Sequence, residues 1–109
     1  MTSCCFVYST LPDVATAQKI AKAIVEERLA ACANILPSMQ SYYWWEGKVE
    51  SAAEVVLIAK TRTECFETLR ARIQSLHPYQ CPCIIALPIE LGHTAFLDWI
   101  RQETHGKNE

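Results

Sequence analysis

The sequence has little glycine and no motif typical of a catalytic or phosphate-binding loop. Only three of its 109 residues are glycine, and they suit a turn or the C-terminal tail better than a Gly-rich phosphate cradle. A Cys83–His77 pair is the nearest approach to a nucleophile and its base, but nothing marks an oxyanion hole or a third, orienting residue. We therefore expect a protein that is not an enzyme.

Long apolar runs and an excess of one charge are missing as well. No run approaches the ~20 residues that cross a bilayer, and the first residues lack the cationic start of a secretory signal. A formal net charge of -2, with scattered basic residues, argues against binding to nucleic acid or to an anionic membrane. We expect one cytoplasmic domain over residues 1–109, with no nucleic-acid or membrane partner.

Six cysteines are present, which in a secreted chain of this length would suggest a disulfide scaffold. The absence of an export signal and the supply of Val, Ile, Leu and Ala favour reduced thiols instead. Cys4, Cys5, Cys32 and Cys65 lie in apolar stretches and are interpreted as small buried hydrophobic residues. Cys81 and Cys83 differ, because their spacing places both sulfur atoms on one side of an extended chain.

Four consecutive aromatic residues, Tyr42 to Trp45, run into the turn Glu46-Gly47-Lys48. Aromatic residues favour strands, so residues 32–45 and 49–60 are predicted to form the two arms of a hairpin about 40 Å long at ~3.3 Å per residue. The helix predicted over residues 13–29 covers only about 25 Å at ~1.5 Å per residue. Such a hairpin leaves aromatic side chains and open strand edges in water, and a second copy of the chain is the simplest cover for them.

The hydrophobic periodicity alternates between strand and helix along the whole chain. Strands are predicted at residues 4–9, 32–45, 49–60 and 82–89. A first helix is predicted at residues 13–29, and a second runs from a Thr61–Glu64 capping box to Leu76. A third helix begins after a cap at Thr94 and points Phe96, Leu97 and Ile100 inward. This order is that of an α+β, ferredoxin-like βαββαβ sandwich with a long central hairpin and a C-terminal helix. Both long helices would cover one face of the sheet, so the other, apolar face also demands self-association.

Several linked motifs resemble a known family. The residues that carry the resemblance are Thr10-Leu11-Pro12-Asp13, Leu29-Ala30-Ala31-Cys32-Ala33-Asn34, Tyr43-Trp44-Trp45-Glu46-Gly47-Lys48, Lys60-Thr61, His77-Pro78-Tyr79 and Ile84-Ile85-Ala86-Leu87-Pro88-Ile89. In this order, from about Phe6 to Arg101, they are similar to the CutA divalent-cation tolerance proteins. The resemblance implies a tight, PII-like homotrimer built through interlocking hairpins, and an association with copper or other divalent cations.

His77, at the predicted end of a helix, has two interpretations. It can donate to free helix carbonyls, or it can offer an imidazole nitrogen to a metal ion, with Cys81 or Cys83 supplying a thiolate. Two departures from the family pattern bear on the second interpretation. Cys83 stands where the family usually has a Glu, and Ser9 stands where some members have a copper-associated Cys, so only part of that copper site carries across.

A second candidate site is a ligand cleft. Lys60 ends an apolar strand, where it can extend to the rim or pair with Glu46 or a bound anion, and Tyr79 and Tyr42 are further candidate lining residues. Tyr43, Trp44 and Trp45 are predicted to pack at the trimer interface. Two functions stay open: metal tolerance through a metal ion or small molecule bound between subunits, or a PII-like signalling or scaffold module that binds an organic or anionic ligand, or a protein, without a physiological metal.

Overall fold

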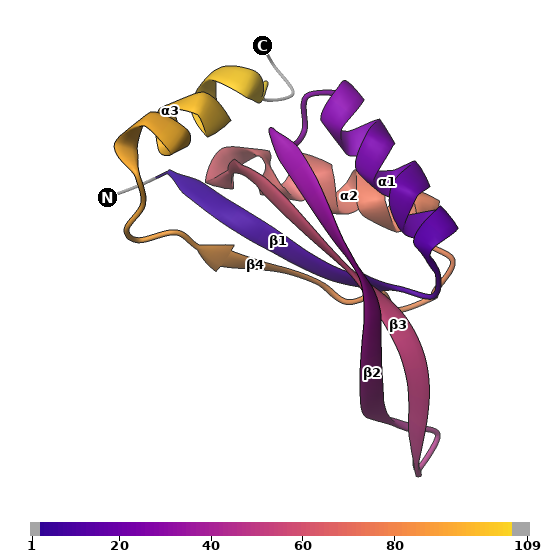
Figure 1. Cartoon of the computed structure of the whole chain (residues 1–109). Coiled ribbons are helices and arrows are strands. Elements are labelled where there is room, and N and C mark those ends of the chain that lie inside the picture. The colour runs from indigo at the N-terminus through magenta and orange to yellow at the C-terminus, as the bar shows by residue number, and fades with distance from the viewer. Residues whose placement is uncertain (1–2, 106–109) are drawn as a thin grey trace.

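A computed structural model describes residues 3–105 of the chain (Figure 1). Its elements are β1 (Cys4–Leu11), α1 (Val14–Glu26), β2 (Cys32–Trp45), β3 (Lys48–Arg62), the 3₁₀ turn η1 (Thr63–Cys65), α2 (Phe66–Leu76), β4 (Ile84–Pro88) and α3 (Thr94–Glu103). The βαββαβ order with a terminal helix is the predicted one.

The four strands form one antiparallel sheet in the order β2-β3-β1-β4. This order places β1 and β3 in the centre, as expected from strands that are apolar on both faces. Pro88 lies on the edge strand β4, and Pro37 lies on the other edge at a register shift between Leu36 and Met39, where proline removes no hydrogen bond that the ladder needs. The predicted ferredoxin-like α+β fold is confirmed.

The β2–β3 hairpin is the longest feature of the molecule, which measures 44 × 26 × 22 Å (Figure 1). Its paired arms end at Trp45 and Lys48, and the two residues between them, Glu46 and Gly47, have φ angles of 51° and 79°. Positive φ at both positions is typical of the type I′ turn that matches the twist of a hairpin. The hairpin end therefore projects beyond the helices, as the lengths of the predicted elements required.

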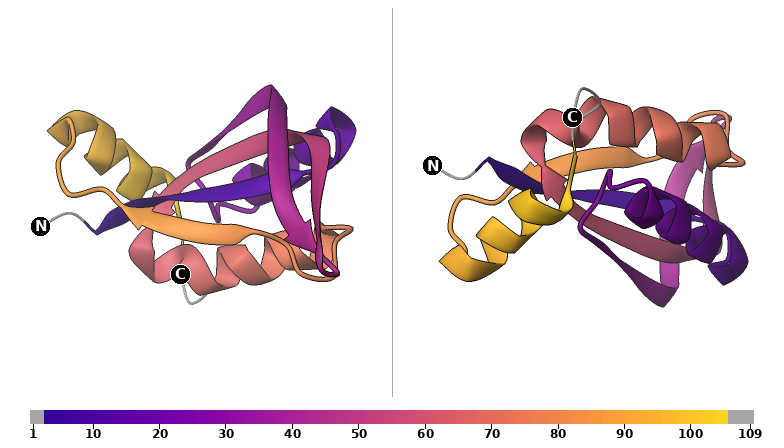
Figure 2. Two further views of the ribbon diagram at one scale, coloured as in Figure 1. Left: turned by 90° about the horizontal axis from the view of Figure 1, so that it is seen from below. Right: turned by 90° about the horizontal axis from the view of Figure 1, so that it is seen from above.

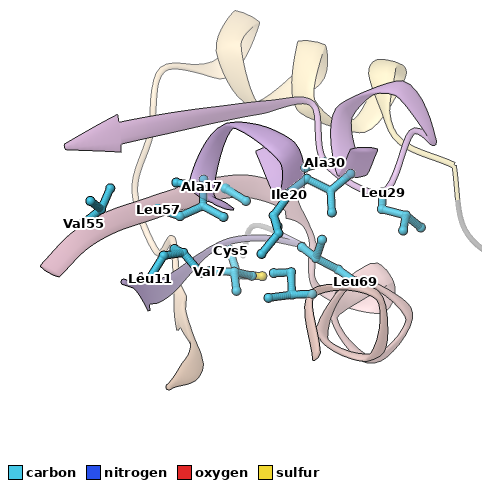
Figure 3. Close-up of a cluster of buried hydrophobic side chains, with 13 residues drawn as sticks. Cys5, Val7, Leu11, Ala17, Ile20, Leu29, Ala30, Val55, Leu57 and Leu69 are labelled. Carbon is cyan, nitrogen blue, oxygen red and sulfur yellow. The ribbon is translucent and has the colours of Figure 1, made fainter. Parts of the chain in front are cut away.

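The main core lies between one face of the sheet and the helices α1 and α2 (Figure 3). Alternate residues of the central strands point into it, and the helices contribute residues at helical spacing. The fully buried members include Val7 and Leu11 from β1, Ile20 and Ile24 from α1, Leu57 from β3, and Leu69 and Ile73 from α2.

The described part of the chain covers the opposite face of the sheet only at one end. There α3 packs Leu97 and Ile100 against Cys4 and Ala31, close to the start of β1 (Figure 2). Away from α3, the side chains of Leu36, Ile85 and Leu87 are 52%, 51% and 40% exposed. The predicted uncovered apolar face is thus present, but α3 covers more of it than expected.

The end of α1 differs from the sequence prediction. The helix stops at Glu26 and not near Leu29, because Arg28 takes a left-handed φ of 63° and the N–H groups of Leu29 and Ala30 both bond the carbonyl of Ile24. The Arg28 guanidinium pairs with the Glu103 carboxylate at 2.8 Å, which joins this turn to the end of α3.

The two predicted threonine caps, at Thr61 and Thr94, are wrong. Thr61 is buried in β3, where its hydroxyl donates to the carbonyl of Leu29 at 2.7 Å instead of capping α2. Thr94 is the first residue of α3, and the cap position belongs to His93, which makes no capping side-chain bond. Phe96 was also expected inside, but it is 41% exposed and stacks on Trp99 with ring centroids 5.6 Å apart.

Candidate functional site at the base of the hairpin

His77 follows the last residue of α2 and is buried, with 8% of its surface exposed. Its Nε2 lies 2.8 Å from the carbonyl oxygen of Thr10, and the backbone N–H of Tyr79 donates to its Nδ1 at 3.1 Å. A carbonyl oxygen only accepts, so Nε2 must carry the proton while Nδ1 uses its lone pair on Tyr79. His77 therefore has no ring nitrogen left for a metal ion, and its predicted donation to helix carbonyls is replaced by donation to β1.

Cys81 and Cys83 both have exposed thiols in the segment that leads into β4. Partial burial raises the pKa of Cys83, and the nearby Glu54 carboxylate raises it further, so its thiol stays protonated at neutral pH. Within residues 3–105, no group of three or more His, Cys, Asp or Glu side chains is placed to hold a metal ion. One subunit thus does not assemble His77, Cys81 and Cys83 as a three-ligand site.

Tyr79 connects this segment to the hairpin. Its hydroxyl donates to Oε2 of Glu54 at 3.3 Å, and its ring lies against the His77 imidazole with centroids 4.8 Å apart and a tilt of 53°. Burial raises the pKa of the Tyr79 phenol, and the Glu54 charge raises it further, so the phenol remains a hydrogen-bond donor. His77 thereby positions Tyr79, and Tyr79 reaches β3.

A shallow pocket of about 200 Å³ lies beside Glu54, where the start of α1 meets the base of the hairpin. Its polar lining comes from Asp13, Ser38 and Glu54, and Pro12 and Pro37 form part of its wall. Glu54 is not among the site residues predicted from the sequence. The signal available was an acidic residue in the middle of the apolar stretch Ala52 to Ala59, where an unpaired charge is costly.

The residues predicted to line one cleft lie far apart along a single subunit and do not meet there. Lys60 lies opposite Cys32, at one end of the hairpin, and its Nζ donates to Oδ1 of Asn34 at 2.6 Å. Glu46 is at the other end, about 40 Å along the strand at ~3.3 Å per residue, so the predicted Lys60–Glu46 pair does not form within the chain. Tyr42, opposite Ser51, lies between them.

The aromatic residues of the hairpin are open to solvent in a single chain. Tyr42 and Trp44 are 74% and 75% exposed, and Trp45 and Tyr43 are 55% and 42% exposed. Large rings left in water at the end of a two-stranded ribbon are typical of a surface that another protein covers. Their place at a trimer interface stays a prediction.

These observations define the class of the molecule: a ferredoxin-like α+β subunit with a projecting aromatic hairpin and, at its base, a shallow pocket with an acidic residue on each side, Asp13 and Glu54. The model of the CutA1 divalent ion tolerance protein family matches residues 5–103. The chain therefore belongs to the CutA1 divalent ion tolerance protein family.

Individual relatives support this family assignment. The divalent-cation tolerance protein CutA of Archaeoglobus fulgidus is 50% identical over 95 residues, which cover 87% of this chain and 92% of that protein. The solved structure of the divalent cation tolerance protein from Thermus thermophilus superposes with a TM-score of 0.91 at 47% identity, covering 94% of this chain and 99% of the other. The Archaeoglobus fulgidus structure, described as a periplasmic protein, gives a TM-score of 0.89 at 46% identity and covers 92% and 97%.

Proposed function

We propose that this chain contributes to divalent-cation tolerance as a cytoplasmic, non-enzymatic homotrimer that binds a metal ion or a small ligand in clefts between subunits. The observation that carries the proposal is the hairpin, whose aromatic end and open edge are left uncovered by residues 3–105 of a single chain. Membership of a divalent ion tolerance family supplies the class of ligand.

The spread of the predicted cleft residues supports a site made by more than one subunit. Lys60 and Glu46 are at opposite ends of one hairpin, and Tyr79 lies near its base, beside Glu54. The hairpin of a neighbouring subunit, laid across the uncovered sheet face, would bring its Tyr42 and Glu46 toward Lys60 and Tyr79 of the first subunit. It would also cover the exposed side chains of Leu36, Ile85 and Leu87. Assembly and ligand binding would then depend on the same surfaces.

The remaining parts of the proposal have more general support. The glycines offer no phosphate-binding loop, and the described titratable residues show no nucleophile beside a base and an orienting group, which favours a binding role over catalysis. A cytoplasmic location is consistent with six free thiols. No described helix is long and apolar enough to cross a membrane.

The proposal is tested on the reduced protein by light scattering combined with metal titration. We expect a mass of three chains, and retention of Zn²⁺ or Cu²⁺ through gel filtration by the trimer. Replacing the exposed Trp44 by Lys should break the trimer and release the ion if the cleft lies between subunits. A trimer that retains neither ion would contradict the metal role and would favour a PII-like signalling or scaffold module for an organic or anionic ligand.

A further inference from the structure

The ammonium group of Lys60 has only a neutral partner in its own chain. Lys60 is half-buried on β3, where its neighbour Ala59 points into the main core, so by alternation Lys60 points to the uncovered face of the sheet. Its Nζ donates to Oδ1 of Asn34 at 2.6 Å, and within residues 3–105 it forms no ion pair. A half-buried ammonium is costly where no anion balances it.

The arginine residues show what is missing at Lys60. Each arginine has a carboxylate oxygen at 2.7–3.2 Å from its guanidinium: Arg28, Arg62, Arg70, Arg72 and Arg101. An ammonium carries three N–H donors, and the Asn34 amide accepts from one of them. The remaining donors of Lys60 suit a carboxylate that the described part of the chain does not supply.

Glu46 is a carboxylate without a partner, and its backbone is strained. It is exposed in the hairpin turn, and none of the ion pairs among the described residues includes it. Its φ of 51° is a conformation that glycine or asparagine adopts more readily than glutamate. Strained residues concentrate at functional positions, which indicates that the Glu46 carboxylate has a use that asparagine would not serve.

The hairpin is long enough to carry Glu46 across the sheet face of another chain. Val55 is the residue of β3 nearest the hairpin end that still pairs with β1, so residues 48–54 overhang by about 20 Å at ~3.3 Å per residue. The stretch of β3 from Val55 to Lys60 measures only about 17 Å on the same scale. In a ring of three whose hairpins lie across the axis, each hairpin is rotated by a third of a turn from the next, so it runs back over its neighbour's face.

We propose that Glu46 of one chain forms an ion pair with Lys60 of the next chain, and that three such pairs close the trimer. The proposal joins the unbalanced cation of the uncovered face to the unbalanced anion of the hairpin tip. It rests on the proposed function, because it takes the trimer as given and names a contact within it.

This ion pair would give the hairpin a defined position on its neighbour. Aromatic rings adhere to an apolar face at more than one register, whereas a carboxylate and an ammonium meet at one place. Lys48 also lies at the tip, opposite Trp45, so the tip as a whole has no excess charge that draws it to Lys60. The pair therefore requires direct contact between the two groups.

The experiment follows the exchange of subunits between isotope-labelled and unlabelled trimers by native mass spectrometry, with circular dichroism to verify folding. It compares the wild type with Glu46→Lys, with Lys60→Glu and with the variant that carries both. An exposed ion pair changes a binding constant by roughly 2–5-fold, and three pairs by about 10–100-fold. Each single reversal should accelerate exchange by about that factor, because most interface substitutions act on dissociation.

The double reversal is the decisive variant. It restores opposite charges between chains, so its exchange rate should return to within about 3-fold of the wild type. Within one chain the two positions lie about 40 Å apart along the strand at ~3.3 Å per residue, so the recovery can only come from contact between chains.

Glu50 supplies the matched control, because it is an exposed residue of the same hairpin, opposite Tyr43. Lys60→Glu combined with Glu50→Lys makes the same changes in charge at the wrong place, and it should exchange as fast as Lys60→Glu alone. A neutral set, Glu46→Gln and Lys60→Met, decides the question if Lys60→Glu does not fold. For a true pair, the second neutral substitution adds nothing to the effect of the first.

A double reversal that exchanges as fast as the single variants would overturn the inference, and so would neutral substitutions whose effects simply add. A wild type that runs as a single chain would overturn both the ion pair and the proposed trimer. Recovery in the double reversal, in a trimer that retains neither Zn²⁺ nor Cu²⁺, keeps the ion pair and rejects the metal role. Metal retention without recovery rejects the ion pair and leaves the proposed function standing.

Discussion

The imidazole Nε2 of His77 donates to the carbonyl oxygen of Thr10 over 2.8 Å, which joins the end of α2 to the end of β1 across 67 positions of sequence. The other ring nitrogen accepts the N–H of Tyr79, so one buried side chain satisfies two backbone groups at the point where the chain leaves the helix. This arrangement gives the His-Pro-Tyr segment a structural role before any ligand is considered.

His77→Ala should accordingly destabilise the subunit by about 1–3 kcal/mol, because the Thr10 carbonyl and the Tyr79 N–H would lose their partner in a partly buried place. Urea unfolding followed by fluorescence measures the change. His93→Ala is the matched control, since His93 is exposed and makes no capping bond, and its effect should stay within ~0.5 kcal/mol. Equal losses in the two variants would contradict the role assigned to His77.

Periodicity was enough to predict the fold. Helical spacing of apolar residues indicates the buried face of α1, at Ala17, Ala21 and Ile24, and the strand around Leu57 is apolar on both faces. The order of the predicted helices and strands then leaves few possible topologies. The hairpin turn was predictable for a local reason, because Gly47 accepts a positive φ without strain.

The site was less predictable, because its contacts join distant segments. Nothing in the sequence near His77 indicates that its partner is the Thr10 carbonyl, and the hydrogen bond from Tyr79 to Glu54 depends on how the chain after α2 returns to β3. The cap at Thr61 failed for a related reason. A threonine hydroxyl bonds whichever acceptor the tertiary structure brings near, and for Thr61 that is the Leu29 carbonyl.

The start of α1 should make stability depend on acid pH. The Asp13 carboxylate accepts the N–H of Thr16 at 2.7 Å, and this bond holds the pKa of Asp13 below its ordinary value of 3.8. Because the folded-state pKa is the lower one, the stabilisation is complete above pH 3.8 and is lost as the pH falls through the folded-state value. Asp13→Ala should therefore lower the melting temperature at pH 7, and the difference from wild type should shrink below pH 3.8.

Asp13→Asn separates the cap from its charge. The amide oxygen still accepts a hydrogen bond from Thr16, so most of the stability at pH 7 should remain. The contribution of position 13 to the acid dependence of the melting temperature should disappear, because an amide does not titrate. Calorimetric scans from pH 7 to pH 3 measure both variants. A deficit of Asp13→Ala that stays constant over this range would show that the carboxylate charge contributes nothing.

The hairpin turn offers a stabilising substitution. Glu46 has a left-handed φ of 51°, which costs a residue with a Cβ about 1–2 kcal/mol, whereas asparagine adopts this conformation more readily. Glu46→Asn should raise the free energy of unfolding by up to ~1 kcal/mol. Gly47→Ala should lower it by about 1 kcal/mol, although no atom lies within 4 Å of the added Cβ, because the cost comes from φ alone. Denaturant titration that gives both changes the same sign would refute the turn assignment.

The aromatic end of the hairpin gives the sharpest test of assembly. Trp44 is 75% exposed in one chain, so Trp44→Lys removes no intramolecular packing of consequence and should leave a folded subunit. If the ring is buried by a neighbour, each interface loses roughly 2–3 kcal/mol of apolar burial and gains a desolvated ammonium, and symmetry repeats the loss at every interface. Light scattering should then report single chains or aggregates instead of trimers.

Lys19→Glu is the control for this substitution, because Lys19 is an exposed residue of α1, on the covered side of the sheet and away from the aromatic end of the hairpin. It changes the net charge by two units, against one for Trp44→Lys, and we expect no change in the mass of the assembly. Trp45→Lys provides a second test, since Trp45 points to the opposite face of the same strand. One face of the hairpin must meet a neighbour if the chain assembles as proposed, so a trimer that survives both tryptophan substitutions would remove the physical basis for subunit association through this hairpin.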